Sequence, residues 1–211
     1  LGGVRPDLVD PLCRGLCEAV IHTATHKIAK TLGAFSWDEV WTKAGFSGGA
    51  STRLPRKLSH PSNKLRGKPH VTRRASVLAM CAIWHAPHWR AYAQHRHGAD
   101  PYNWIEIVPG ARLDTVPKDA KTDRTIAIEA DLNMFFQKGI GRVIRLRLKR
   151  VGIDLDSALR NQEYALIGSL DGSLATIDLA SASDSVAWKL VELLLPPDWF
   201  AALDMVRSEY V

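Results

Sequence analysis

Two aspartates near the carboxyl end of the chain, Asp178 and Asp184, are the residues best suited to chemistry. They lie in the stretch ATIDLASASDS, among small and apolar residues. We expect a strand over 174–179, and because alternate side chains of a strand share a face, Asp178 would point away from the core that receives Ile177. A carboxylate there needs a cation or hydrogen-bond donors, and Mg²⁺ takes carboxylate oxygens together with water and phosphate oxygens.

Purely structural roles stay open for both aspartates. Asp178 would then accept turn amides, and Asp184 would cap a helix that starts at Ser183 to Ser185 and stops at Pro196 and Pro197.

A second candidate cluster is cationic. The stretch VPKDAKTDRTIAIE holds Lys118, Lys121 and Arg124 at a tight connection, within a hairpin predicted from Arg112 to Glu129. Three cations so close repel one another unless a polyphosphate lies between them, with Arg as a fork and Lys as point charges. The alternative is a solvated turn balanced by Asp119 and Asp123.

A long basic stretch precedes this hairpin. No Asp or Glu occurs from Val40 to Ala99, and aromatic residues and histidines are interleaved with the cations. Such a surface attracts a polyanion, so we predict nucleic-acid contact rather than only a solvated basic face. The candidate RNA-binding residues are Arg53, Arg56, Lys57, Lys64, Arg66, Lys68, Arg73 and Arg74.

The elements that must position these residues follow from local patterns. Ser36 and Glu39 form a capping box, which predicts a helix from Ser36 that stops before Gly45. Gly139 and Gly141 lack a dinucleotide fingerprint, and we interpret them as close-packing glycines. The other predictions are a helix over 7–32, a loop at FSGGASTRLPR, irregular chain at HPSNKLRGKPH, a helix over 73–93 interrupted near Pro87, short extended runs from Trp104, a helix from about Asp131 and a boundary loop at 168–172.

Composition sets the broad class. The chain has 211 residues, 46% of them hydrophobic, and a net charge of +6, which suits one large domain or two small ones. It contains no run of about 18 apolar residues and no basic-then-apolar leader, so we expect neither a membrane span nor a secretory signal. Three cysteines argue against a disulfide framework.

Several motifs together resemble one family. VPKDAKTDRTIAIEADLNMFFQKGIG, GIDL, ATIDLASASDS and ELLLPPDWF are similar to the replicase catalytic (beta) subunit of single-stranded RNA bacteriophages, the levivirus-type RNA-directed RNA polymerases. The likeness is specific from about Asp114 to Arg207, and FSGGAST resembles the family's glycine-rich loop. It implies an α+β, partial right-hand polymerase: a helical and basic fingers region at 1–110, a fingers hairpin and helix at 111–170, and the start of the palm at 171–211.

The resemblance also assigns roles to the candidate residues. Asp178, with the carbonyl of Leu179, would bind two catalytic Mg²⁺ ions. Ser183 and Asp184 would lie near the incoming ribose, and the hairpin cations would hold the triphosphate. The implied reaction is attack of a 3′ hydroxyl on the α-phosphorus of a nucleoside triphosphate, with release of pyrophosphate.

One departure from the family pattern is large. The chain contains no Gly-Asp-Asp, the motif that carries the second set of metal ligands. We therefore expect an amino-terminal fragment that is inactive alone. Implied partners are the RNA template and product, ribonucleoside triphosphates, host elongation factors Tu and Ts and a ribosomal protein, in the cytoplasm of a bacterial host.

Two other functions compete with this interpretation. One is a non-catalytic RNA-binding module in which the basic surface acts and Asp178 is structural. The other is a different magnesium enzyme acting on phosphate esters through Asp178 and Asp184, although their separation of six positions does not match an Asp-x-Asp nucleophile motif.

Overall fold

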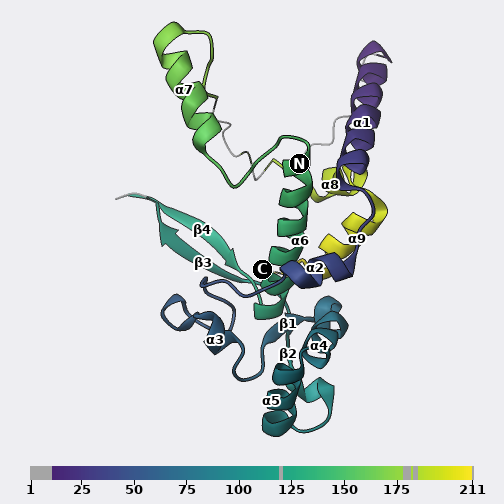
Figure 1. Cartoon of the computed structure of the whole chain (residues 1–211), viewed down its shortest axis with the longest axis vertical. Helices are drawn as coiled ribbons and strands as arrows, with labels where there is room; N and C mark the ends of the chain where they lie inside the picture. Colours follow the sequence, from purple (N-terminus) through teal and green to yellow (C-terminus); the bar gives the residue numbers. More distant parts are fainter. Residues whose placement is uncertain (1–10, 119–120, 178–181, 183–184, 211) are drawn as a thin grey trace. The chain divides into compact units, whose positions relative to one another are not determined.

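The computed structural model describes residues 11–118, 121–177, 182 and 185–210. Its helices and short strands confirm the α+β class (Figure 1). The predicted site residues Asp178, Leu179, Ser183 and Asp184 lie outside the described residues, as does Asp119. None of the described helices is long and apolar enough to span a membrane.

The chain groups into two compact units by internal contacts. One combines residues 1–35 with 144–200, and the other combines 36–143 with 201–211. Helix α6 (Asp131–Arg150) and helix α9 (Pro197–Val206) contribute residues to both units.

The second unit contains most of the described strands and short helices. Strand β1 pairs in parallel with β2, and β3 pairs antiparallel with β4. The elements are α2 (Trp37–Lys43), α3 (Pro61–Lys64), β1 (His70–Thr72), α4 (Ser76–His85), α5 (Pro87–His97), β2 (Glu106–Val108), β3 (Arg112–Pro117), β4 (Asp123–Ile128) and the first part of α6, with 3-10 turns at Arg56–Leu58, Arg73–Ala75 and Pro101–Trp104.

The predicted cap and hairpin are both confirmed. The hydroxyl of Ser36 accepts a hydrogen bond from the Glu39 amide at 3.4 Å, at the start of α2. Strands β3 and β4, the pair of long arrows in Figure 1, run in register from Arg112 opposite Ile128 to Pro117 opposite Asp123.

The glycines of α6 differ from each other. A Cβ on Gly139 would lie 2.9 Å from Cγ1 of Val40 and 3.1 Å from Cα of Ala44, so Gly139 allows α2 to pack closely. A Cβ on Gly141 would meet no atom within 4 Å. The close-packing interpretation is therefore confirmed for Gly139 and wrong for Gly141.

The core of this unit forms around one face of α6, where Leu132, Phe136, Ile140 and Val143 are buried. Trp41 packs edge-on against Phe136 at 5.5 Å. Asn133, also buried, accepts from the Thr72 amide at 3.0 Å and donates to the Val206 carbonyl at 2.9 Å. One amide side chain thus joins β1, α6 and the end of α9.

For residues 60–97 the structure confirms one prediction and corrects another in part. The predicted break at Pro87 is confirmed, because α4 ends at His85 and α5 begins with that proline, which suits the first helical turn. Helix α5 extends to His97 and ends at Gly98, whose φ is +88°. The prediction of irregular chain over 60–70 is wrong in part, because α3 and the start of β1 lie there.

The first unit contains α1 (Pro11–Leu32), α7 (Leu159–Asp171), α8 (Trp188–Leu194) and the first turn of α9. Its most buried aromatic is Trp199, whose Nε1 donates to the Gly33 carbonyl at 2.8 Å. The Arg147 guanidinium lies 5.1 Å from that ring and donates to the Ala34 carbonyl at 2.9 Å.

Three predictions for this unit are wrong. The boundary loop at 168–172 is the last turn of α7, and only Gly172, in the left-handed region, leaves the helix. Helix α8 begins at Trp188, later than the predicted start at Ser183 to Ser185.

The third error is the strand over 174–179. Its described part, 174–177, is not a strand, and Ile177 is 79% exposed rather than directed into a core. A strand needs a neighbouring strand to accept and donate its backbone hydrogen bonds. Within the described residues, no strand pairs with 174–177.

Candidate functional site

A cleft of about 430 Å³ lies between the glycine-rich loop and the β3–β4 hairpin. Both sides belong to the second unit. One side is formed by Gly48, Gly49, Ala50, Pro55 and Arg56, and the other by Arg112, Asp114, Val116, Ile126 and Ile128. Two features that the sequence singled out separately therefore face each other across one space.

The strand register tells which hairpin residues share the face toward the cleft. Val116, which lines the cleft, lies opposite Arg124, so the two side chains share that face. Lys118 donates its amide to the Thr122 carbonyl at 3.0 Å, which continues the register by one more pair. Alternation then puts Lys118 on the same face as Val116.

The structure therefore brings two of the three predicted triphosphate ligands, Lys118 and Arg124, to the cleft face of the hairpin. Lys121 lies in the connecting turn, next to residues 119 and 120, which are outside the described part of the chain. All three side chains are exposed to solvent.

The glycine-rich loop is fixed by side chains that hold its carbonyl groups. Lys64 Nζ donates to the Ser47 carbonyl at 2.9 Å and to the Gly49 carbonyl at 2.6 Å. The Ser59 hydroxyl donates to the Gly48 carbonyl at 2.5 Å. Lys138 Nζ, from α6, donates to the Phe46 carbonyl at 3.1 Å. Four consecutive carbonyls thus accept hydrogen bonds from side chains, which fix the backbone of the loop.

Lys64 is fully buried, so the expectation that it lies on an RNA-facing surface is wrong. The pKa of Lys64 is lowered, mainly because the ammonium group is buried. The nearby negative charge of Asp131 opposes this shift. A buried ammonium is tolerated when donors and a counter-charge compensate it. Here two carbonyls and Asp131 do so, and Lys64 acts as a scaffold residue.

Arg53 is a second scaffold cation. Its Nε donates to the Asp131 carboxylate at 3.0 Å, and its two terminal nitrogens donate to the carbonyls of Arg66 at 2.8 Å and Lys64 at 3.0 Å. Asp131 is fully buried and also accepts from the His70 amide at 3.1 Å. The Arg53 side chain is only 18% exposed, so, as for Lys64, the expectation that it lies on an RNA-facing surface is wrong.

Arg74 differs from both of these residues because it is half exposed. It forms ion pairs with Asp204, at 2.5 Å, and with Glu209, so its charge is balanced within the protein. The remaining predicted RNA-binding residues are exposed: Arg56, Lys57, Arg66, Lys68 and Arg73. Of these, Arg56 lines the cleft.

Sequence reasoning missed three residues of this region. Arg112 and Asp114 line the cleft, and Nη2 of Arg112 lies 3.7 Å from Oδ2 of Asp114. The alternation of β3 was the signal that would have placed them on the face of Val116. Asp131 gave no such signal, because an acid at the start of a helix usually indicates only a favourable interaction with the helix dipole.

Metal ligation has no candidate cluster in the part of the chain that the structure describes. Within it, no three His, Cys, Asp or Glu side chains come together to hold a metal ion. The predicted ligands, Asp178 and the Leu179 carbonyl, lie outside that part.

Comparison with known proteins agrees with the motifs. The family model "RNA replicase, beta-chain" matches residues 3–211. The chain is 42% identical over 207 residues to the RNA-directed RNA polymerase subunit beta of Escherichia virus Qbeta, covering 97% of this chain and 33% of the relative. It is 41% identical over 196 residues to the RNA-directed RNA polymerase beta chain of Enterobacteria phage GA, covering 93% and 36%.

A third relative is the RNA-directed RNA polymerase beta chain of Escherichia phage MS2, at 38% identity over 198 residues, covering 90% of this chain and 34% of the relative. The chain thus spans about a third of the length of the curated relatives it matches. The family model nevertheless matches nearly all of it, and the chain belongs to the RNA replicase beta-chain family.

Proposed function

We propose that this chain supplies the fingers and the start of the palm of an RNA-directed RNA polymerase that transfers ribonucleotides to a growing RNA strand. Residues 1–110 and 111–170 would form the fingers, and 171–211 would begin the palm. The observation that carries the proposal is the cleft in which the cationic hairpin face meets the ordered glycine-rich loop. Family membership supports the same conclusion.

The cleft suits the triphosphate of an incoming nucleotide. Arg124 would hold phosphate oxygens as a bidentate fork, and Lys118 and Lys121 would act as point charges. In the reaction the 3′ oxygen of the nascent strand forms a bond to the α-phosphorus and loses its proton to water, while the bond from that phosphorus to the bridging oxygen breaks. Pyrophosphate leaves with that electron pair, and the three cations would neutralise its charge.

The remaining roles rest on the family motif. Asp178, with the Leu179 carbonyl, would hold Mg²⁺, which when bound stabilises the charge on the entering and leaving oxygens. Ser183 and Asp184 would contact the ribose. The RNA template and product, host elongation factors Tu and Ts and a ribosomal protein would be the partners, in the cytoplasm of the bacterial host.

Substitution of Arg124 by Ala tests the nucleotide role of the hairpin. It should raise the KM for ribonucleoside triphosphates at least tenfold in a replicase beta chain that contains these residues, because one charge-assisted fork is lost. Thr125→Ala is the matched control, since Thr125 lies on the opposite face of β4. Normal KM values together with weakened RNA binding would move Arg124 to the template path.

Substitution of Asp178 by Asn tests the catalytic role. Nucleotide incorporation should be abolished, while RNA binding measured by filter retention stays within twofold. Incorporation that survives this change would remove Asp178 from the reaction and leave a non-catalytic RNA-binding module. The exposure of the candidate RNA-binding residues Arg56, Lys57, Arg66, Lys68 and Arg73 also supports that module.

A further inference from the structure

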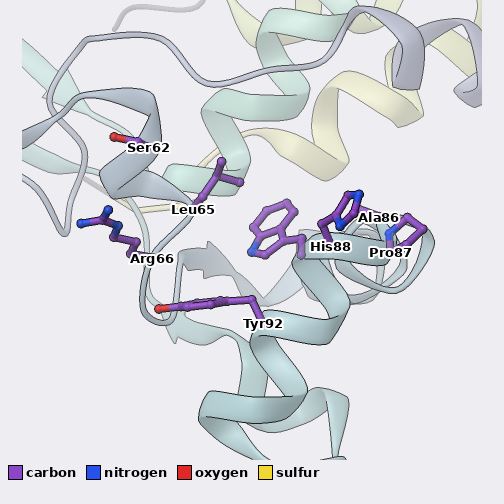
Figure 2. A pocket seen from close by; sticks show the side chains of 8 residues that line it. Ser62, Leu65, Arg66, Ala86, Pro87, His88 and Tyr92 are labelled. Carbon is purple, nitrogen blue, oxygen red and sulfur yellow. The ribbon is translucent and has the colours of Figure 1, made fainter.

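A second pocket, of about 500 Å³, lies between the end of α3 and the first half of α5 (Figure 2). It does not share a lining residue with the cleft at the hairpin. Its lining includes Arg66, His88, Trp89 and Tyr92. This volume lies within the range of sites that bind small molecules or single nucleotides.

The aromatic walls of this pocket are held in place. Trp89 and Tyr92 are three positions apart on α5 and therefore share a face. The Trp89 ring packs against Phe46 at 5.9 Å and Phe135 at 6.4 Å. The Tyr92 hydroxyl accepts a hydrogen bond from the Gly67 amide at 3.3 Å, and Figure 2 shows the Tyr92 ring extending from the helix toward Arg66.

The charge around the pocket favours an anionic ligand. None of its lining residues is acidic, and all of them lie within the stretch from Val40 to Ala99 that contains no Asp or Glu. Arg66 and His88 are exposed at the pocket, so a guanidinium and an imidazole are available to a phosphate. A purely apolar ligand would make no use of them, and a cation would be repelled by Arg66.

We propose that this pocket binds an unpaired nucleotide of single-stranded RNA, with the base against Trp89 and Tyr92 and a phosphate at Arg66. Proteins that bind single-stranded nucleic acid combine aromatic rings with nearby cations, and stacking accepts any base. The inference rests on the proposed polymerase function, because it adds a template or product contact outside the nucleotide cleft. One guanidinium is too little charge for a triphosphate, which favours a diester.

Photocrosslinking tests the contact directly. The probe is a 12-nucleotide oligouridylate carrying one 5-iodouridine, bound to a replicase beta chain that contains these residues. The adduct should map to Trp89 or Tyr92. An RNA duplex of the same length should compete poorly, since its bases are paired. Adducts confined to residues outside the pocket would overturn the proposal.

Binding measurements on variants provide the second test. Tyr92→Leu should weaken oligouridylate binding roughly 5- to 100-fold, the range for losing one stacked base, whereas Tyr92→Phe should retain most of the affinity. Arg66→Glu alters an exposed side chain and should weaken binding at least fivefold, which keeps the test valid if Tyr92→Leu does not fold. Arg96→Glu is the charge-matched control, because Arg96 is exposed on the same helix outside the pocket.

Equal affinity for wild type and for Arg66→Glu would overturn the proposal, as would equal losses in Arg66→Glu and Arg96→Glu. Loss of a protein partner with unchanged RNA affinity would instead assign the pocket to protein docking. The KM for nucleotides at saturating RNA separates this inference from the proposed function. Pocket variants should leave that KM unchanged, whereas Arg124→Ala should raise it even if the pocket binds no RNA.

Discussion

Two regions of the second unit hold cations in opposite environments. One is the anchor of the glycine-rich loop, formed by Lys64, Arg53 and Asp131, and the other is the β3–β4 hairpin. In the anchor, Lys64 is fully buried and the Arg53 side chain is 18% exposed, and carbonyl and carboxylate oxygens receive their donors. On the hairpin, Lys118 and Arg124 are exposed. The first pair orders the loop, and the second is available to a ligand. A cation whose N–H groups donate to oxygens of the protein thus stabilises the fold, whereas a cation whose N–H groups face solvent can bind a ligand.

The largest effect is expected from removing the buried acid of the anchor. Asp131→Ala would leave the Arg53 guanidinium without its carboxylate in a nearly buried site, so the free energy of unfolding should fall by about 3–5 kcal/mol. Urea unfolding of the purified chain measures it. Asp123→Ala, at an exposed hairpin position, is the matched control and should change stability by less than about 0.5 kcal/mol. Equal losses at both sites would contradict the difference between buried and exposed charges.

Removing the buried ammonium should have the next largest effect. Lys64→Met keeps the length of the side chain but leaves the carbonyls of Ser47 and Gly49 without their donor, which should cost about 2–3 kcal/mol. Lys57→Met, at an exposed position, should cost less than about 0.5 kcal/mol. A Lys64→Met chain as stable as wild type would mean that the loop does not depend on this anchor.

The pH dependence of stability tests whether burial lowers the pKa of Lys64. Because burial lowers the pKa of Lys64 below its usual 10.5, the unfolded chain binds more protons than the folded chain between the two pKa values. Wild-type stability should therefore rise relative to Lys64→Met as pH increases toward 10.5. Parallel urea titrations of both chains at several pH values measure the difference. A constant difference would contradict a lowered pKa.

The glycines of α6 extend the contrast between packed and open positions. Gly139→Ala would bring a Cβ within 2.9 Å of Val40, and this overpacking should lower stability by about 1–3 kcal/mol. Gly141→Ala meets open space and should raise stability by about 0.5–1 kcal/mol through helix propensity. Thermal unfolding distinguishes the two signs, and a loss in both variants would show that Gly141 is also constrained.

The smallest effect on folding belongs to the hairpin cations. Lys118→Ala and Arg124→Ala should change the free energy of unfolding by less than about 0.5 kcal/mol, because both side chains are exposed. Calorimetry measures the change. A loss of more than about 2 kcal/mol would mean that these residues stabilise the fold, as the anchor does, and would contradict the proposed nucleotide site.

Features that depend only on neighbouring residues could be predicted from the sequence. The capping box at Ser36, the break at Pro87 and the hairpin from Arg112 were all readable, because turns, caps and strand alternation are local. The family motifs were readable for the same reason. Where a local pattern needed a distant partner, as in the strand over 174–179, the prediction was wrong in its described part.

Tertiary structure alone decided which cations are scaffold and which are surface. Arg53 reaches Asp131, 78 positions away in the chain, and Arg74 reaches Asp204, 130 positions away. No local signal distinguishes these residues from Arg56 or Arg66, since all are arginines in an acid-free stretch. Burial and counter-charge come from elements that meet only on folding, and the cleft between loop and hairpin exists for the same reason.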